Sequence, residues 1–250
     1  MLFRSWVAER AVKAGSGFSA RIENVSGTLP FSLKVGRFAL SDAKGPWLVI
    51  SDAAFSWSPA ALLTGRVVIH EIAADVVRLR RAPDIPETNR APVTFEWPPR
   101  FPRLPPILLD RLAVSRLILD KELAGQAAVI GLSGRLAESG QGAAALTLAA
   151  KRLDGEAPLT LSVGAALNYA DWRLAVKASL DDAAGGLIAS ALAGDDRTPF
   201  ALEALGDGPL DAWKGRLSAR LGAADLLVAD LGLGIPLAKD ARAAFSLDLG

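Results

Sequence analysis

The single histidine and two pairs of aspartates are the residues of this sequence whose types could do chemistry. A catalytic histidine needs a nucleophile and an orienting acid, and a histidine metal site needs several ligands, whereas His70 is the only histidine among 250 residues. Asp181-Asp182 and Asp195-Asp196 could form an acid pair or bind a cation, but beside Gly and Ala they are typical of hairpin turns. We predict an exposed or edge-strand histidine and no catalytic or metal-binding residue.

The glycine-containing motifs also fail to complete any catalytic or nucleotide-binding pattern. Gly131-Leu-Ser-Gly134 does not have the spacing of a nucleophile elbow, and Gly232-Leu-Gly234 is followed by Ile-Pro-Leu instead of a dinucleotide fingerprint. The absence of cysteine excludes disulfides, thiol nucleophiles and cysteine-ligated metals. The sequence therefore predicts a protein that is not an enzyme and that uses no cofactor.

Charge and hydropathy narrow the kinds of partner. With 28 basic and 27 acidic residues the net charge is +1, which gives no overall field to hold nucleic acid. The hydrophobic fraction is 51%, yet the longest uncharged stretch, Ala157 to Ala170, is shorter than the ~18 residues of a membrane-spanning helix. The apolar excess must be buried inside, against a partner or against a ligand.

From Phe18 onward, apolar and polar residues alternate with a period of two. The pieces are short, are separated by turn clusters such as Ser41 to Pro46, and predict strands with one buried face. Pro59 to Leu63 is an exception and predicts one helical turn, capped by Ser58 and ended by Gly65. The pattern predicts an all-β chain with short helical turns, in which repeated units build an elongated sheet.

The alternation places large apolar residues on one face of the first strands. An ordinary sandwich core and an open groove both agree with this pattern. In the second interpretation the residues lining the groove are Leu29, Phe31, Leu33, Val35, Phe38, Leu40, Val49, Phe55, Trp57 and Ile69.

Later parts of the chain repeat the pattern with a weak internal echo. Ile72 to Leu79 matches Leu112 to Leu119, and we interpret the shared unit as a strand end, a tight polar turn and a new strand. Asp154-Gly155, Asp181-Asp182 and Gly206-Asp207-Gly208 are predicted to be turns.

Four segments follow from these patterns. We expect an amphipathic helix over 1–17, a first β repeat over 18–81, a proline-rich connection over 82–108, and further β repeats over 109–250 that end in mid-strand. Within and before the proline-rich part, basic residues form either a solvated edge or an attraction for phosphate headgroups. They are Arg78, Arg80, Arg81, Arg90, Arg100 and Arg103.

Several stretches resemble the N-terminal region of the TamB family, the AsmA-like subunits of the translocation and assembly module. The resemblance is strongest before Arg81, and its motifs are structural. The stretches are Val25 to Leu29, Ser41 to Leu48, Trp57 to Arg66, Leu112 to Leu119 and Gly206 to Gly215.

The resemblance implies a long antiparallel sheet curled into a taco-like groove with an apolar interior. It further implies a periplasmic protein anchored in the inner membrane by a helix that precedes this chain, with the outer-membrane barrel TamA as partner. The expected function is to shelter phospholipid acyl chains during transport between the two membranes and to support outer-membrane protein assembly. Two alternatives remain open: a chaperone or scaffold groove for nascent outer-membrane proteins, and an adhesin with a closed β core.

Overall fold

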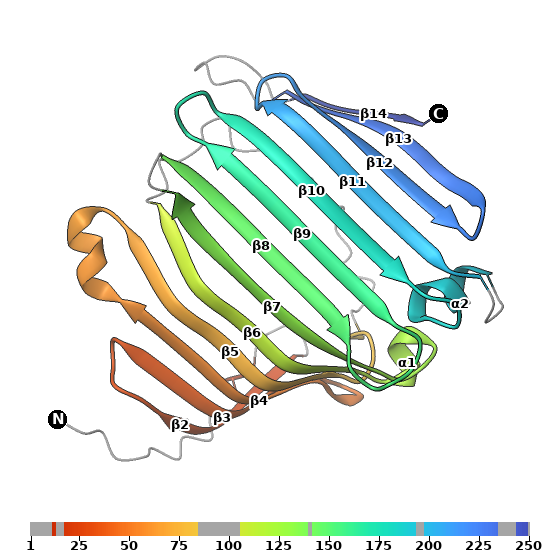
Figure 1. Ribbon diagram of the computed structural model, residues 1–250. Helices are drawn as coiled ribbons and strands as arrows, with labels where there is room; N and C mark the ends of the chain where they lie inside the picture. Colours follow the sequence, from red (N-terminus) through yellow and green to blue (C-terminus); the bar gives the residue numbers. More distant parts are fainter. Residues whose placement is uncertain are drawn as a thin grey trace. The chain divides into compact units, whose positions relative to one another are not determined.

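The computed structural model describes residues 12–13, 18–84, 106–139, 142–193, 198–234 and 244–249, and nearly all of them lie in strands (Figure 1). The chain divides into two units, residues 1–95 with 107–133 and residues 96–106 with 134–250. Within each unit, strands that follow one another in the chain are neighbours in the sheet. The predicted fold class is confirmed: the chain is all-β, with curled, open and mostly antiparallel sheet and short helices.

The first unit holds strands β1 to β6, one 3₁₀ helix, the short helix α1 and the beginning of β7. Their bounds are β1 Val12–Lys13, β2 Ser19–Ser26, β3 Ser32–Asp42, β4 Gly45–Ser58, η1 Pro59–Thr64, β5 Val67–Leu79, β6 Ile107–Leu119, α1 Lys121–Ala124 and β7 Ala128–Ser139.

Two local predictions in this unit are confirmed. The cluster Ser41 to Pro46 forms a tight hairpin, in which Asp42 pairs with Gly45 and accepts a hydrogen bond from the backbone N–H of Lys44 at 2.8 Å. The predicted helical turn is η1, and Gly65 ends it in the left-handed region with φ 70°. Ser58 occupies the N-cap position as predicted, but its side chain makes no capping hydrogen bond.

The pairing of β5 with β6 is parallel, whereas β2 to β5 pair with one another in antiparallel fashion. A parallel pair needs a connection that returns the chain to the other end of the strands. The segment between Leu79 and Ile107 is that connection, and residues 85–105 within it, with the strand piece predicted near Val93 to Trp97, lie outside the described residues. Ile107 and Leu108 belong to β6 and not to the predicted connection.

The two segments that match in sequence pair with each other in the sheet. Ile72 pairs with Leu112 and Leu79 with Leu119, so the two matching octets lie side by side in register. The predicted polar turn inside each octet is wrong, because β5 and β6 run through them without a break. Repeated sequence here specifies two neighbouring strands and not two hairpins.

The N-terminal segment and the domain boundary differ from expectation. Val12 and Lys13 pair with Ala20 and Ser19 as a short strand where a helix was predicted over 1–17, and the rest of that segment lies outside the described residues. The two units divide after Ser133, inside β7, and not at the proline-rich segment alone.

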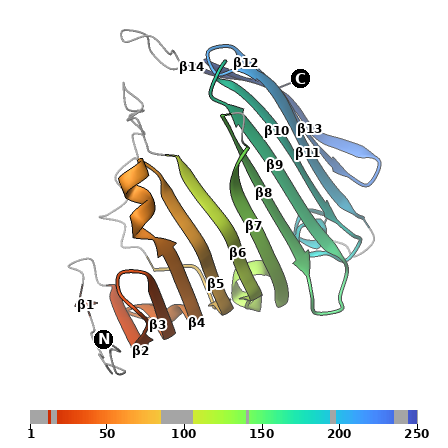
Figure 2. The same ribbon diagram turned by 60° about the vertical axis from the view of Figure 1, so that its left-hand side comes forward.

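The second unit is built mainly of antiparallel strands of 9 to 11 residues, with the six-residue β14 as the last of them (Figure 2). The remaining strands and helix are β8 Ala143–Arg152, β9 Leu159–Asn168, β10 Arg173–Asp182, α2 Leu187–Ala193, β11 Phe200–Pro209, β12 Trp213–Leu221, β13 Ala224–Gly234 and β14 Ala244–Leu249.

Two predicted turns of the second unit lie in strands instead. Gly206, Asp207 and Gly208 belong to β11, where Asp207 pairs with Ala175 on one side and Lys214 on the other. Asp181 and Asp182 end β10 and pair with Thr160 and Leu159. Pairing on both sides of these residues outweighs their local turn preference. The predicted turn at Asp154-Gly155 is confirmed between β8 and β9.

Helix α2 covers part of one sheet face in this unit. Ala189 on the helix and Phe200 and Ala219 on the sheet form a buried apolar cluster. Asp182 holds the helix start, because its Oδ2 accepts hydrogen bonds from the backbone N–H groups of Ile188 and Ala189 at 2.7 and 2.8 Å. A side chain at Gly186 would meet the Asp182 carboxylate, so this position requires glycine.

We expect the Asp182→Ala variant to lower the free energy of unfolding by about 1–2 kcal/mol, because two N–H groups of α2 lose their acceptor. Urea denaturation of the whole chain measures this change. The neighbouring Asp181→Ala, at an exposed position, is the matched control and should change stability by less than about 0.5 kcal/mol. Equal effects of both substitutions would contradict the capping role.

Candidate apolar sheet face

The ten residues predicted to line a groove are not sealed in a core. Leu29 and Phe31 lie in the turn between β2 and β3 and not on a strand, with 74% and 53% of their surface exposed. The other eight lie on β3, β4 and β5, and each is half-buried. Large apolar side chains in a closed sandwich core would be almost fully buried. The closed-core interpretation is therefore not what this unit shows.

Cross-strand pairing identifies which residues share a face, because directly opposed residues in a sheet point to the same side. Near one end of the strands, three successive rows of opposed residues are entirely apolar. The rows are Trp57–Ile69–Leu109, then Leu33–Phe55–Ile72–Leu112, then Val25–Val35–Ala53–Ala74–Val114.

Two more apolar rows cross β2 to β6 nearer the other end. They are Ile22–Phe38–Ile50–Val77–Leu117 and Ala20–Leu40–Leu48–Leu79–Leu119. In β3 the first set of rows uses Leu33 and Val35 and the second uses Phe38 and Leu40, so the apolar positions change from odd to even. Strict alternation would put the two sets on opposite faces.

The row between these sets interrupts the alternation. Asn24 and Asp52 have positive φ angles of 56° and 51°, and neither they nor Gly36 take part in the regular pairing of β2, β3 and β4. A Cβ at Gly36 would lie 2.8 Å from that of Asn24, so only glycine fits there. A residue in the left-handed region bends a strand and re-aims the side chains that follow, as in a β-bulge.

An ion pair supports this change of phase. Arg116 is opposite Val76, so strict alternation would place Asp75 and Arg116 on opposite faces. Arg116 nevertheless donates a hydrogen bond from Nη2 to Asp75 Oδ2 at 2.7 Å. The alternation therefore shifts by one position at this row, and all five apolar rows lie on one face.

Val49 does not belong to that face, and its assignment to the predicted groove is wrong. Val49 is opposite Ala39 and Arg78, whereas Phe38 is opposite Ile50 and Leu40 is opposite Leu48. The sequence prediction moved the apolar residues from odd to even positions at Gly36 in β3. In β4 it kept them at odd positions on both sides of Asp52. Leu48 and Ile50 replace Val49 on the apolar face.

The opposite face of this unit carries the charges, and most of them are paired. No residue of the five apolar rows is ionisable. Ion pairs between β5 and the segment from β6 to Asp120 include Glu71–Arg111 at 3.2 Å, Asp75–Arg116 at 2.7 Å and Arg78–Asp120 at 3.0 Å. Arg78 and Arg81 of the predicted basic stretch are thus engaged by carboxylates, while Arg90, Arg100 and Arg103 lie outside the described residues.

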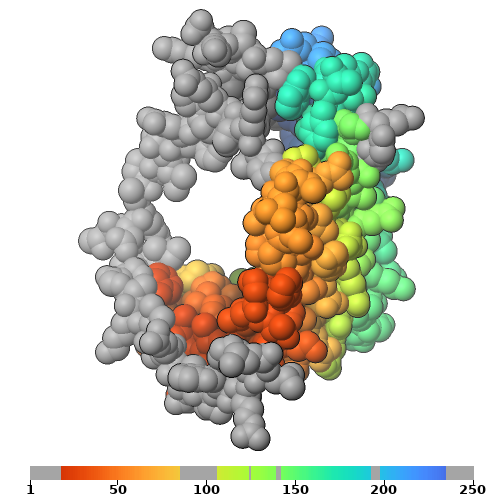
Figure 3. All heavy atoms as spheres, turned by 90° about the vertical axis from the view of Figure 1, so that its left-hand side faces the viewer, coloured from red at the N-terminus to blue at the C-terminus, as the bar shows by residue number. Residues whose placement is uncertain are grey.

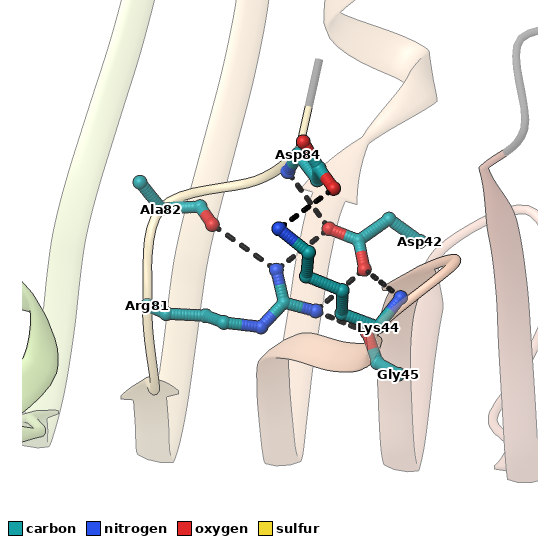
Figure 4. Close-up of polar contacts among 6 residues, drawn as sticks. All are labelled: Asp42, Lys44, Gly45, Arg81, Ala82 and Asp84. Atoms are coloured by element: carbon teal, nitrogen blue, oxygen red, sulfur yellow. Dashed lines mark hydrogen bonds and ion pairs between the residues drawn. The ribbon is translucent and has the colours of Figure 1, made fainter. Parts of the chain in front are cut away.

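A polar cluster ties the chain after β5 to the β3–β4 hairpin (Figure 4). Arg81 donates to Asp42 Oδ2 at 2.7 Å and to the carbonyl of Gly45 at 2.9 Å, and the backbone N–H of Asp84 donates to Asp42 at 2.8 Å. The hydrogen bonds from Arg81, opposed by desolvation and aided by the backbone N–H groups of Asp84 and Lys44, hold the pKa of Asp42 well below its usual range. Lys44 adds an ion pair to Asp84 at 3.0 Å.

The second unit has an equivalent apolar face that the sequence analysis did not identify. Its strands alternate regularly through three rows, and the pairing of β12 with β13 shifts register only beyond them, between Ala219 and Arg220. The rows are Ala150–Leu161–Leu180–Leu202–Ala219–Leu227, then Leu148–Val163–Ala178–Ala204–Leu217–Ala229, then Leu146–Ala165–Val176–Gly206–Gly215–Leu231. The intervening rows hold charged residues such as Lys177, Arg216 and Asp230.

Trp213 covers the glycines of this second face. A Cβ at Gly206 or at Gly215 would meet the Trp213 ring at 2.0 or 2.6 Å, and the Trp213 indole N–H donates to the carbonyl of Leu174 at 2.9 Å. The two glycines thus leave space for one large aromatic side chain. The face remains apolar where the strands themselves have no side chain.

The residues considered for chemistry are dispersed. His70 Nδ1 lies 2.8 Å from Asp110 Oδ2 with both side chains exposed, and Gly131 and Gly232 lie in β7 and β13. Asp195-Asp196 lies outside the described residues. In the part of the chain that the structure describes, no group of three or more His, Asp or Glu side chains is placed to hold a metal ion. Within the same residues, no helix is long and apolar enough to cross a membrane.

The geometry defines a class of protein: a β-sheet protein whose sheet carries one uncharged, half-exposed face and one charged face. Comparisons with known proteins add no identity to this class. No family model, no curated protein and no solved structure matches the chain.

We expect the stabilising effect of the Asp42–Arg81 cluster to depend on pH in the acid range. Because the pKa of Asp42 is lower in the folded state than in the unfolded chain, its contribution is complete above about pH 4 and is lost as pH falls further. Asp42→Asn should therefore be less stable than the wild type near neutral pH, and the difference should shrink below about pH 4. Urea denaturation across this pH range measures it, and a constant difference would contradict the assignment.

Proposed function

We propose that this chain is a segment of a periplasmic groove protein that shelters phospholipid acyl chains during transport between the inner and outer membranes and supports outer-membrane protein assembly. The observation that carries the proposal is the continuous set of apolar rows on one face, which contains no ionisable side chain in the first unit and remains half-exposed. Such a face exposes hydrocarbon to water unless a ligand covers it.

The energetics favour an acyl chain as that ligand. Removing a methylene group from water contributes about 0.8 kcal/mol, so a sixteen-carbon chain lying on the face gains up to ~13 kcal/mol. The rows repeat the same residue class at each strand, about 4.8 Å apart, so a chain meets similar surface at each step. Charged side chains lie on the opposite face, where they do not oppose this burial. No catalytic step is needed.

The sequence resemblance to the TamB family supports the cellular part of this proposal. It supplies the periplasmic location, the inner-membrane anchor and the barrel partner TamA, which are proposed for this chain on that basis. The single-layer sheet with one apolar face is the architecture that the resemblance implies.

Photo-crosslinking tests the function at residue resolution. A photoreactive side chain at Ile50 or Phe38, on the apolar face, should capture phospholipid, whereas the same probe at Val49, on the opposite face of the same strand as Ile50, should give only background. The crosslinking is done in cells, and mass spectrometry of the adducts identifies the captured molecule. Equal capture at Ile50 and Val49, or none at either, would contradict the proposal. Native mass spectrometry of the purified chain should also detect bound phospholipid.

A scaffold for outer-membrane strands is the second candidate, and the edge of the first unit favours it. Among the described residues, β1 pairs only with Ser19 and Ala20 of the eight-residue strand β2. An exposed strand edge can pair with an extended segment of another chain. Photoreactive probes in β2, at Glu23 or Val25, should then capture nascent outer-membrane proteins, and probes at Ile50 should not. Lipid at Ile50 with no protein at β2 would favour the first function alone.

A further inference from the structure

Helix α2 lies on the same face of the second unit that carries the apolar rows. Its Ala189 is fully buried, and the sheet residues packed around it come from two neighbouring rows. They are Leu180, Leu202, Ala219 and Leu227 of one row, and Phe200 and Leu221 of the row beyond it. The chain thus supplies its own cover for the end of this apolar face, beside the ends of β10 and β11 (Figure 1).

The side chains beneath α2 are removed from water, whereas those in the next row are not. Phe200 and Ala219 are each 7% exposed, but Leu217 and Ala178 stay half-buried. The leucines of η1 in the first unit show the other extreme, because Leu63 is 90% exposed and the atoms around η1 (orange) face the viewer uncovered in Figure 3. At α2, unlike at η1, the structure shows which segment occupies an apolar surface.

The outer side of α2 is apolar as well. Residues 183–192 contain no ionisable side chain and one hydroxyl, that of Ser190, and Leu192 is 54% exposed. A surface helix carries polar and charged residues on the side away from the core, whereas a helix that is apolar all round is a buried one. The composition of α2 therefore fits surroundings in which hydrocarbon lies on both of its sides.

The docked position of α2 carries a cost that favours its release. Oδ2 of Asp182 accepts hydrogen bonds from the N–H groups of Ile188 and Ala189, but Oδ1 of the same buried carboxylate has no hydrogen-bond partner among the described residues. A buried carboxylate oxygen without a partner has lost its hydration without replacement. Gly185, with φ 76°, and Gly186 precede the helix and let the backbone change direction there.

The hydrophobic effect holds α2 on the sheet only while the alternative is water. A helix of seven residues is too short to be stable alone, so α2 depends on burying Leu187, Ile188 and Ala189 against the face. Once hydrocarbon covers the face, these side chains are out of water whether or not they touch the sheet, and docking gains little. A hydrocarbon ligand and α2 therefore compete for the same rows.

We propose that α2 is a displaceable cover of the second apolar face, which occupies the end rows when the face is free of ligand and leaves them when acyl chains spread over it. Displacement by acyl chains rests on the proposed function, in which α2 is the element that controls access to this face. Because the coupling is reciprocal, weaker docking of α2 must give tighter binding of the ligand.

Hydrogen exchange in the whole chain tests the displacement. On addition of palmitoyl lysophosphatidylcholine below its micelle concentration, the N–H groups of Ile188 and Ala189 should exchange about tenfold faster, because they lose Asp182 as acceptor. Amides in the strand ladders of β9 to β12 should exchange at an unchanged rate. A ligand that binds beside a fixed helix would leave the α2 amides unchanged or protect them, and either result would overturn the inference.

Variants that weaken docking test the competition. A photoreactive side chain at Leu217, in the row next to α2, should capture this lysolipid at a concentration roughly fivefold lower or less in D182A and in I188A than in the wild type, since less docking free energy opposes binding. I188A leaves the Asp182 cap in place and serves if D182A does not fold. D181A, at the exposed neighbouring position, is the matched control and should behave like the wild type. A purely structural role of α2 predicts unchanged or weaker capture.

Failure of this cover and failure of the proposed function give different results. Lipid captured at Leu217 without faster exchange in α2 and without a gain in D182A or I188A would overturn the cover and leave the proposed function standing. The same holds for lipid captured at Ile50 of the first unit but at Leu217 in no variant. Capture at neither position would overturn both.

Discussion

The constraint on which this structure depends is the alternation of side chains in long strands that have no second layer packed over most of their length. Among the described residues, the fully buried apolar ones are few and half are alanine. Larger side chains such as Phe38, Phe55 and Trp57 are covered only in part, by their cross-strand neighbours. The sheet itself thus removes only part of the apolar face from water, and this is why the face defines the candidate site.

The two units keep that face apolar in different ways. In the first, the strands are up to 14 residues long, and a row with left-handed residues at Asn24 and Asp52 shifts the alternation by one position. In the second, strands near ten residues alternate regularly through three apolar rows, and α2 and Trp213 cover part of the face. A long strand that bends sharply needs such an interruption, because side-chain direction and backbone curvature change together.

The sequence predicted the strands well where one periodic pattern held, because burial of one face is a local property of alternation. It located the change of phase at Gly36, where the pattern breaks visibly. It missed the change at Asp52, because both odd and even positions near this residue are apolar. It could not give the parallel pairing of β5 with β6, which depends on residues far apart in the chain. Gly206 to Gly208 was misassigned because glycine there accommodates Trp213 and serves no turn. The second apolar face was missed because its residues are mostly Ala and Leu, without an aromatic pattern.

A face built from repeated rows has consequences for what it would bind under the proposed function. A pocket discriminates between ligands through a few polar groups placed at fixed points, whereas these rows offer only hydrocarbon at each strand. Such a surface would select a long, uncharged chain over a compact or charged ligand and would hold it at many equivalent positions with similar energy. Discrimination must then come from the places where the repetition stops. In the described residues these are the phase shift at Asn24 and Asp52, which interrupts the rows, and the indole of Trp213 and the helix α2, which cover part of the face.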